Sequence, residues 1–272
     1  MAADLARLSE RLAAVLRDCG QATIAVSGGV DSMTLASFAH RLAAADGVRM
    51  VHAISPAVPR AATVRVRELA QAEGWRLDVV DAGEFADPRY RANPLDRCYF
   101  CKSNLYRTLG ELAPGVVLSG TNGDDLGDFR PGLRAAAEWQ VRHPYVEAGM
   151  AKADVRALAR RLDLPDLAAL PASPCLASRV ETGIAIAADT LTLVDAVEVW
   201  ARERLAADTV RCRVRTDGLV LELDPATLSG LTATRRLSLL AEMQSRFPAA
   251  DGVRFAAYRR GSAFVGDRAA AG

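Results

Sequence analysis

The chain has 272 residues, which favours two domains over a single compact one. Half of the residues are hydrophobic and a quarter are charged, a composition that supports a buried core and excludes general disorder. The formal net charge of +1 gives no overall field that would draw the chain to nucleic acid or to an anionic membrane surface. We therefore expect neither as a partner.

The N-terminal segment, MAADLARLSERLAAVLRDC, carries charges throughout and lacks the apolar centre of a secretory signal. No apolar run approaches the ~20 residues that cross a bilayer as a helix. A cytoplasmic protein is therefore expected. Its five cysteines, an odd number, favour thiols, metal ligands or reactive groups over a disulfide framework.

Apolar periodicity predicts an amphipathic helix over 3–19 and a buried strand over 23–26. Similar patterns predict strands at 50–54, 77–80 and 116–118, with helices over 61–73, 102–112 and 151–163. Alternating strands and helices predict an α/β fold with a doubly wound parallel sheet. The loops after the strands should then carry the chemistry, because ligands bind at the carboxyl ends of such strands.

Three prolines between 164 and 178 predict a connection rather than a helix or strand, so we set domains at 1–170 and 171–272. The second half contains predicted helices over 187–206 and 233–246, and predicted strands at 210–215, 219–223 and 252–258. Thr216-Asp217-Gly218 is a typical hairpin turn. A smaller C-terminal α+β domain is therefore expected, with a frayed tail, GDRAAAG.

A glycine-rich loop follows the first predicted strand and opens a helix. It contains the candidate phosphate-binding residues Ser27, Gly28, Gly29, Asp31 and Ser32. Glycines free the backbone N–H groups and a helix N-terminus favours an anion, so the loop is suited to phosphate. It is not a Walker A loop, because the Gly-Lys-Ser/Thr ending is missing. From the short pattern alone, a glycine turn that only caps a helix remains the alternative.

This loop resembles the SGGxDS signature of the PP-loop ATP pyrophosphatases, which have an adenine nucleotide alpha hydrolase-like fold. The resemblance implies that ATP binds here with Mg²⁺ beside Asp31, that AMP is transferred to a substrate oxygen, and that pyrophosphate is released. A second polar segment follows the fourth predicted strand, where Asn122, Asp124 and Asp125 suit Mg²⁺ or ribose contacts. A solvated acidic turn is the alternative for this segment.

Cysteines mark a third candidate site. Cys98 and Cys101 form a Cys-x-x-Cys at the start of a predicted helix, and Cys175 lies near the predicted domain junction. The pair alone is compatible with zinc, redox or iron–sulfur chemistry. Structural zinc would need one more ligand, whereas three thiolates suit a 4Fe-4S cluster with one iron open to sulfide or substrate. Cys19 and Cys212 are expected to be buried core residues.

Together these motifs resemble the LarE family, ATP-dependent sulfur transferases that make the nickel-pincer nucleotide cofactor of lactate racemase. The resemblance runs through most of the chain. It rests on SGGVDS, HAISPAVP, RCYFCKSNLY, GTNGDDLGDFRPG, VEAGMAKADVRALARRLDLP, PCLASR and RVR. It implies that a carboxylate of pyridinium-3,5-biscarboxylate mononucleotide is adenylated, joined to sulfur and released as a thiocarboxylate.

The family resemblance also implies roles for the cysteines. In some members the cysteine that matches Cys175 gives up its own sulfur and becomes dehydroalanine, and the other two positions are not cysteines. This chain has all three, so it resembles the variant in which Cys98, Cys101 and Cys175 hold a 4Fe-4S cluster and the sulfur comes from a cluster-bound hydrosulfide. A sacrificial Cys175 without a cluster is the alternative.

Four further residues match family positions. Arg213 and Arg215 alternate on one predicted strand, so both should face one side and grip the phosphate of the substrate. A solvated strand face is the alternative. Glu198 matches an acidic position near the reaction centre, and Arg179 a position that contacts nucleotide phosphate or pyrophosphate. The resemblance also implies a homo-oligomer.

Three other functions stay open. PP-loop proteins with clustered cysteines also thiolate tRNA, but near-neutral charge and the lack of an evident RNA-binding domain disfavour that role. An NAD synthetase-like ligase would use ammonia as the nucleophile and would not need three cysteines. A nonenzymatic module that senses ATP or carries sulfur, with cysteines that bind only zinc, is the third alternative.

Overall fold

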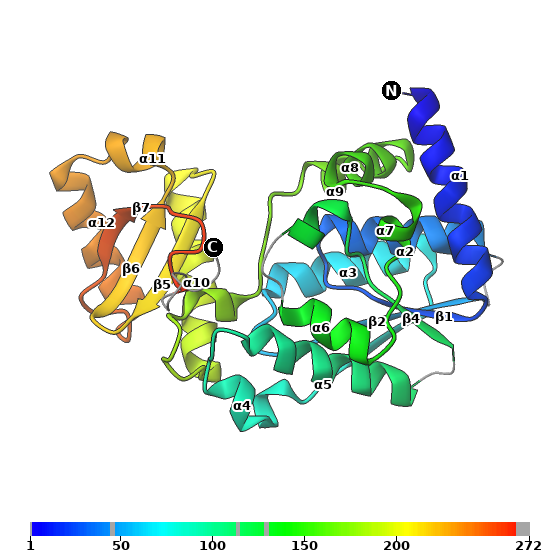
Figure 1. Ribbon diagram of the computed structural model, residues 1–272. Helices are drawn as coiled ribbons and strands as arrows, with labels where there is room; N and C mark the ends of the chain where they lie inside the picture. The colour runs from blue at the N-terminus through cyan, green and yellow to red at the C-terminus, as the bar shows by residue number, and fades with distance from the viewer. Residues whose placement is uncertain (1, 44–46, 113–114, 128–130, 265–272) are drawn as a thin grey trace. The chain divides into compact units, whose positions relative to one another are not determined.

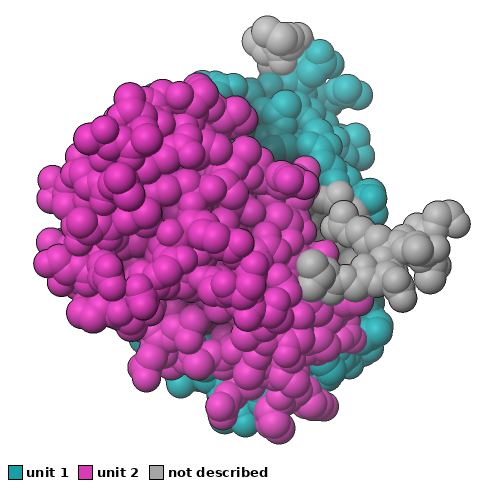
Figure 2. Space-filling model, turned by 90° about the vertical axis from the view of Figure 1, so that its left-hand side faces the viewer, with its two compact units in different colours: residues 1–87, 98–173 teal, residues 88–97, 174–272 magenta. Residues whose placement is uncertain are grey.

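The computed structural model describes residues 2–43, 47–112, 115–127 and 131–264 (Figure 1). The chain separates into two compact units, which Figure 2 colours differently. Unit 1 is formed from residues 1–87 and 98–173, and unit 2 from residues 88–97 and 174–272. The predicted domains 1–170 and 171–272 stay a prediction, because compact units reflect contacts and not independent folding.

Unit 1 contains a four-stranded parallel sheet in the order β3–β2–β1–β4. The strands are β1 (Ala22–Ala25), β2 (Val48–Ala53), β3 (Leu77–Val80) and β4 (Val116–Leu118). The predicted doubly wound parallel sheet is therefore confirmed. Strand order reverses between β1 and β4, and ligands bind at the carboxyl ends of the strands at such a switch point.

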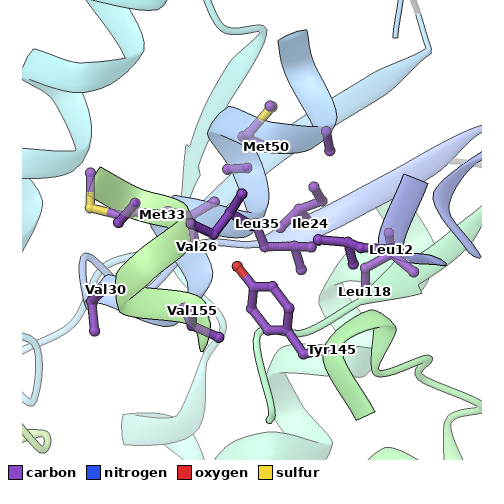
Figure 3. Close-up of a cluster of buried hydrophobic side chains, with 14 of the residues drawn as sticks. Leu12, Ile24, Val26, Val30, Met33, Leu35, Met50, Leu118, Tyr145 and Val155 are labelled. Carbon is purple, nitrogen blue, oxygen red and sulfur yellow. The ribbon is translucent and has the colours of Figure 1, made fainter. Parts of the chain in front are cut away.

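Helices cover both faces of this sheet (Figure 1). One face carries α1 (Ala2–Cys19), α2 (Val30–Leu42), α3 (Arg60–Glu73), α7 (Pro144–Ala148), α8 (Lys152–Arg161) and α9 (Pro165–Ala169). Their apolar side chains meet Ile24, Met50 and Leu118 of the sheet, with the ring of Tyr145 among them (Figure 3). The other face carries α5 (Arg97–Leu112) and α6 (Pro131–Glu138), which pack against Val51 and Val117. Successive strand residues thus point to opposite cores.

Unit 2 contains a mixed three-stranded sheet in the order β5–β6–β7. Strands β5 (Val210–Arg215) and β6 (Gly218–Leu223) are antiparallel, and β6 is parallel to β7 (Arg254–Ala257). The helices of this unit are α4 (Pro88–Arg91), η3 (Leu176–Arg179), α10 (Ala188–Leu205), α11 (Pro225–Gly230) and α12 (Ala233–Arg246). The predicted smaller α+β region is confirmed, and the predicted frayed tail lies outside the described residues.

Most predicted elements are confirmed within a few residues, but two predictions were wrong. The helix expected at 102–112 begins earlier, at Arg97. The sequence prediction missed its first turn because the aromatic residues there obscure the helical spacing of apolar residues. The connection expected at 164–178 contains α9, which begins with Pro165 at a position where the missing N–H costs nothing. Short 3-10 helices also occur as η1 (Glu84–Ala86) and η2 (Gly123–Gly127). Among the described residues, no helix has the length and apolarity needed to span a membrane.

Asn93 fastens the segment 88–97 into unit 2. It is fully buried and has a left-handed backbone conformation, with φ of 54°. Its side-chain Nδ2 donates to the carbonyl oxygens of Glu181 at 2.8 Å and Ile184 at 2.9 Å. Its Oδ1 accepts a hydrogen bond from Arg97 Nη1 at 3.0 Å. Asparagine suits this position, because its short polar side chain tolerates the left-handed region.

We predict that Asn93→Ala lowers the free energy of unfolding by roughly 3 kcal/mol or more, since several buried polar groups lose their partners. Urea denaturation measures the change. Gln140→Ala is the matched control, because Gln140 has a similar φ of 53° but an exposed side chain. Equal stability losses in the two variants would contradict the conclusion that the Asn93 side chain fastens segment 88–97 to unit 2.

Candidate functional site

The loop between β1 and α2 is compact and braced from within. Ser32 Oγ accepts a hydrogen bond from Ser27 N at 3.0 Å and lies 3.1 Å from Ser27 Oγ. Gly28 has φ of 81°, and a Cβ there would lie 2.7 Å from the carbonyl oxygen of Ala62. Gly29 is the N-cap of the 13-residue α2. Backbone N–H groups at the start of this helix are therefore available to an anion, and the two serines shape the loop as well as lining it.

The segment after β4 meets this loop. A Cβ at Gly120 would lie 2.7 Å from Ser32 N, so only glycine fits between the two backbones. Asn122 Nδ2 donates to Asp31 Oδ1 at 3.2 Å. The N–H of Asn122 donates to Asp125 Oδ2 at 3.1 Å, which fixes the turn. The predicted residues of the two segments thus come together at the switch point of the sheet.

Lys152, which the sequence analysis did not single out, completes this cluster. Its ammonium group forms an ion pair with Asp31, and its N–H donates to Asp124 Oδ2 at 3.1 Å. The hydroxyl of Tyr145 donates to the carbonyl oxygen of Asp31 at 3.1 Å. Burial raises the pKa of the Tyr145 phenol well above its ordinary value, so it stays a neutral donor. A single lysine at the start of a helix does not indicate a binding site by itself. The sequence therefore provided no reason to single out Lys152.

Asp31 and Asn122 have donors that fit Mg²⁺. Magnesium prefers one or two carboxylates together with phosphate oxygens and water. The Asp31 carboxylate is a quarter exposed at its side chain and already holds the cation of Lys152. A metal ion with a bound triphosphate would meet Asp31 at this same position.

Buried His52 contacts the backbone just before the same loop. Its Nδ1 lies 2.7 Å from the carbonyl oxygen of Val26, and its Nε2 lies 2.9 Å from Thr63 Oγ1. Burial lowers the pKa of His52, which keeps the ring neutral. The side chain therefore ties the last residue before the loop to α3.

Arg179 and Glu198 form a buried ion pair in unit 2. Each is 1% exposed, and Arg179 Nε and Nη2 donate to the two Glu198 carboxylate oxygens at 2.8 and 3.0 Å. Burial alone would raise the pKa of Glu198, but the hydrogen-bonded guanidinium outweighs it and holds that pKa below its ordinary value. Both groups are therefore charged and neutralise each other.

The ion pair holds the backbone around Cys175. Arg179 Nη1 donates to the carbonyl oxygens of Pro174 at 2.8 Å and Cys175 at 3.3 Å. Glu198 Oε1 also accepts the N–H of Cys212 at 3.0 Å. In this arrangement Arg179 makes its contacts to protein groups, and the geometry favours a positioning role over direct contact with a nucleotide.

Arg213 and Arg215 lie on the same face of β5, and both contact Glu222. Arg213 is 4% exposed, with Nε 2.9 Å from Glu222 Oε2 and Nη1 2.9 Å from the carbonyl oxygen of Ser178. Arg215 ion pairs with Glu181 and Glu222, each at 3.3 Å. Arg215 lines a cavity of about 670 Å³ beside Arg254 and Arg259, whereas Arg213 does not line it and contacts the lining residue Glu222.

The cysteines divide between the units, and all five are thiols. Cys98 and Cys101 are half-buried near the start of α5, at positions three apart that share one side of the helix. Cys175 is exposed and precedes η3 in unit 2. Within the described ranges, no three Cys, His, Asp or Glu side chains are grouped as a metal site. The joint ligation of one cluster by these three thiols stays a prediction.

Cys19 and Cys212 are buried, as predicted. Burial raises the pKa of the Cys212 thiol to about 12, so it is a neutral core side chain.

We predict that Glu198→Gln lowers the free energy of unfolding by about 3–5 kcal/mol at pH 7, because the Arg179 charge stays buried without its partner. The pKa of Glu198 is lowered in the folded state, so this stabilisation is present above the ordinary glutamate pKa of about 4.3 and is lost as the pH falls through the folded value. Urea denaturation at several pH values measures it. Glu203→Gln, at an exposed position of the same helix, is the control, and equal stability of the two variants would refute the role.

Comparison with known proteins gives two relatives that match most of the chain. It is 36% identical over 242 residues to the uncharacterized protein slr1717 of Synechocystis sp., covering 88% of this chain and 89% of that protein. It is 32% identical over 230 residues to the pyridinium-3,5-bisthiocarboxylic acid mononucleotide synthase of Lactiplantibacillus plantarum, covering 83% of each. The uncharacterized protein MJ0830 of Methanocaldococcus jannaschii is 29% identical over 136 residues, or 48% of this chain.

No protein-family model matches the chain. The match to the Lactiplantibacillus synthase nevertheless extends over 230 residues, which is more than either compact unit contains. With 32% identity over 83% of both chains, the protein belongs to the LarE family, that of pyridinium-3,5-bisthiocarboxylic acid mononucleotide synthase.

Proposed function

We propose that the chain is an ATP-dependent sulfur transferase in nickel-pincer cofactor biosynthesis. It adenylates a carboxylate of pyridinium-3,5-biscarboxylate mononucleotide, releases pyrophosphate, and replaces AMP by sulfur to give a thiocarboxylate. The observation that carries the proposal is the contact of Asp31, in the 27–32 loop, with Asn122 and Lys152 in a chain of this family.

The adenylation site is the switch point of the sheet in unit 1. Backbone N–H groups of the loop and the α2 N-terminus hold the β and γ phosphates, and Asp31 meets the magnesium ion that accompanies them. Lys152, which is ion-paired with Asp31, supplies a further cation beside the phosphate oxygens. These groups stabilise the charge that develops on the leaving pyrophosphate.

The sulfur step uses the thiols. Three thiolates fit an iron–sulfur cluster as donors, and Cys98, Cys101 and Cys175 would hold it. Such a cluster, when bound by these thiols, would supply the sulfide-level sulfur for the displacement of AMP. Arg179 and Glu198 hold the backbone of Cys175 in place for either sulfur source.

In the rival form of this step, Cys175 itself attacks the acyl adenylate. AMP leaves, and the resulting thioester then eliminates to a thiocarboxylate and a dehydroalanine at position 175. The exposure of Cys175 is compatible with this route. Cys98 and Cys101 would then have another use.

The cavity beside Arg215 is proposed to bind the phosphate of the pyridinium mononucleotide. A phosphate there would take over donors that now serve Glu181 and Glu222, since guanidinium groups bind phosphate and carboxylate alike. Arg213 holds Glu222 and so sets the position of that competing carboxylate.

The other functions remain distinguishable by simple measurements. Retention of tRNA at physiological salt would favour tRNA thiolation. Ammonia-dependent release of AMP would favour an amidating ligase. One zinc per chain without pyrophosphate release would favour a nonenzymatic module.

We predict that Asp31→Asn lowers the rate of pyrophosphate release on the order of 100-fold, because the magnesium–triphosphate loses its carboxylate partner. Pyrophosphate is measured with MgATP and pyridinium-3,5-biscarboxylate mononucleotide as substrates. Asp189→Asn, at an exposed position of α10, is the control and should retain the full rate. Wild-type rates in Asp31→Asn would refute the adenylation site.

We predict that Cys98→Ser, purified and reconstituted without oxygen, loses bound iron and acid-labile sulfide and forms no thiocarboxylate, while pyrophosphate release persists. The control is Cys19→Ser, because Cys19 is buried and donates to the Val15 carbonyl oxygen, a bond that serine keeps. Unchanged iron and product in Cys98→Ser would exclude the cluster. Loss of one H₂S from the mass of Cys175 after turnover would then identify the sacrificial route.

A further inference from the structure

Arg65 of α3 contacts the loop of the candidate ATP site directly. Its Nη1 donates to the carbonyl oxygen of Gly28 at 2.6 Å. Ala62 lies one turn earlier on the same side of α3 and packs closely on Gly28. A Cβ added at Gly28 would lie 2.7 Å from the carbonyl oxygen of Ala62. The start of α3 is therefore fitted against the loop, and the guanidinium of Arg65 is held beside it.

The charge of Arg65 has little compensation in this position. The side chain is half-buried, and within the described parts of the chain it forms no ion pair with an Asp or Glu. Burial lowers the pKa of Arg65, and Glu68 on the same helix opposes this only in part. By contrast, Arg142 on the same unit lies between Asp18 and Glu147.

The other cations of the proposed chemistry are already engaged. Lys152 is ion-paired with Asp31, and Arg179 donates two hydrogen bonds to the carboxylate of Glu198. The loop itself has no lysine of the kind that Walker loops place on phosphate. Arg65 is therefore a cation beside the loop whose charge is not neutralised by a carboxylate. A highly charged leaving group such as pyrophosphate would need such a cation.

We propose that Arg65 binds the β and γ phosphates of ATP and stabilises the departing pyrophosphate. This inference rests on the proposed function. A substrate carboxylate oxygen attacks the α phosphorus, the bond from that phosphorus to the bridging oxygen breaks, and pyrophosphate leaves with the electron pair. The Gly28 carbonyl holds one N–H of Arg65, and the remaining N–H groups serve the phosphate oxygens.

The test is the binding of pyrophosphate and of AMP, each with Mg²⁺, measured separately by calorimetry on the full chain. Arg65→Gln should raise the Kd for pyrophosphate about 10-fold to 100-fold, the loss expected for charge-assisted hydrogen bonds. The Kd for AMP should stay within about twofold, because AMP lacks the β and γ phosphates. Arg67→Gln, at an exposed position on the same helix, is the matched control and should leave both constants unchanged.

Three results would overturn the inference. A pyrophosphate Kd in Arg65→Gln equal to that of the wild type removes the binding role. Equal weakening of pyrophosphate and AMP reduces Arg65 to a support of the loop. If Arg65→Gln does not fold, Arg65→Lys and Arg65→Met take its place. A wild-type pyrophosphate Kd in both of these variants would contradict a phosphate-binding role for Arg65. Failure of the wild type to bind pyrophosphate or ATP would instead refute the proposed function.

Discussion

Three backbone segments of unit 1 meet so closely that a side chain does not fit between them. Gly28 lies against the carbonyl oxygen of Ala62 on α3, and Gly120 lies against the N–H of Ser32 on α2. This contact fixes the loop after β1, the segment after β4 and the start of α3 relative to one another. This close packing also positions the polar groups of the candidate ATP site. Asp31 is next to Ser32, Asn122 is two residues after Gly120, and Arg65 is hydrogen-bonded to Gly28. A larger residue at either glycine would separate these groups.

Unit 2 is organised by buried charge instead of by close backbone packing. Arg179 with Glu198 and Arg213 with Glu222 are ion pairs that are almost completely excluded from solvent. Breaking such a pair leaves an uncompensated buried charge, so each pair strongly favours one arrangement of the segments that it joins. The first pair fixes the backbone of Cys175, and the second fixes Glu222 next to Arg215 at the cavity. Charges that the sequence suggested as ligand contacts are, in the structure, largely contacts within the protein.

The sequence predicted the sheet of unit 1 well, because short apolar runs separated by helical periodicity leave few other topologies. It also placed Ser27, Asp31 and Asn122 at the same edge, since they lie in the segments that follow β1 and β4. It did not reveal Lys152, Arg65 or Tyr145, whose roles depend on contacts between elements far apart in the chain. Nor did it show that 88–97 packs with the C-terminal residues, because Asn93 is one polar residue in a proline-containing stretch. The pairing of Arg179 with Glu198 was likewise invisible, although both residues were singled out.

The most direct test of the proposed activity is the product formed from pyridinium-3,5-biscarboxylate mononucleotide under strictly anaerobic conditions, with MgATP and sulfide, followed by mass spectrometry and AMP quantification. The thiocarboxylate product and AMP are expected in equal amounts. Release of AMP and pyrophosphate without incorporation of sulfur, or with ammonia in its place, would contradict the proposed activity.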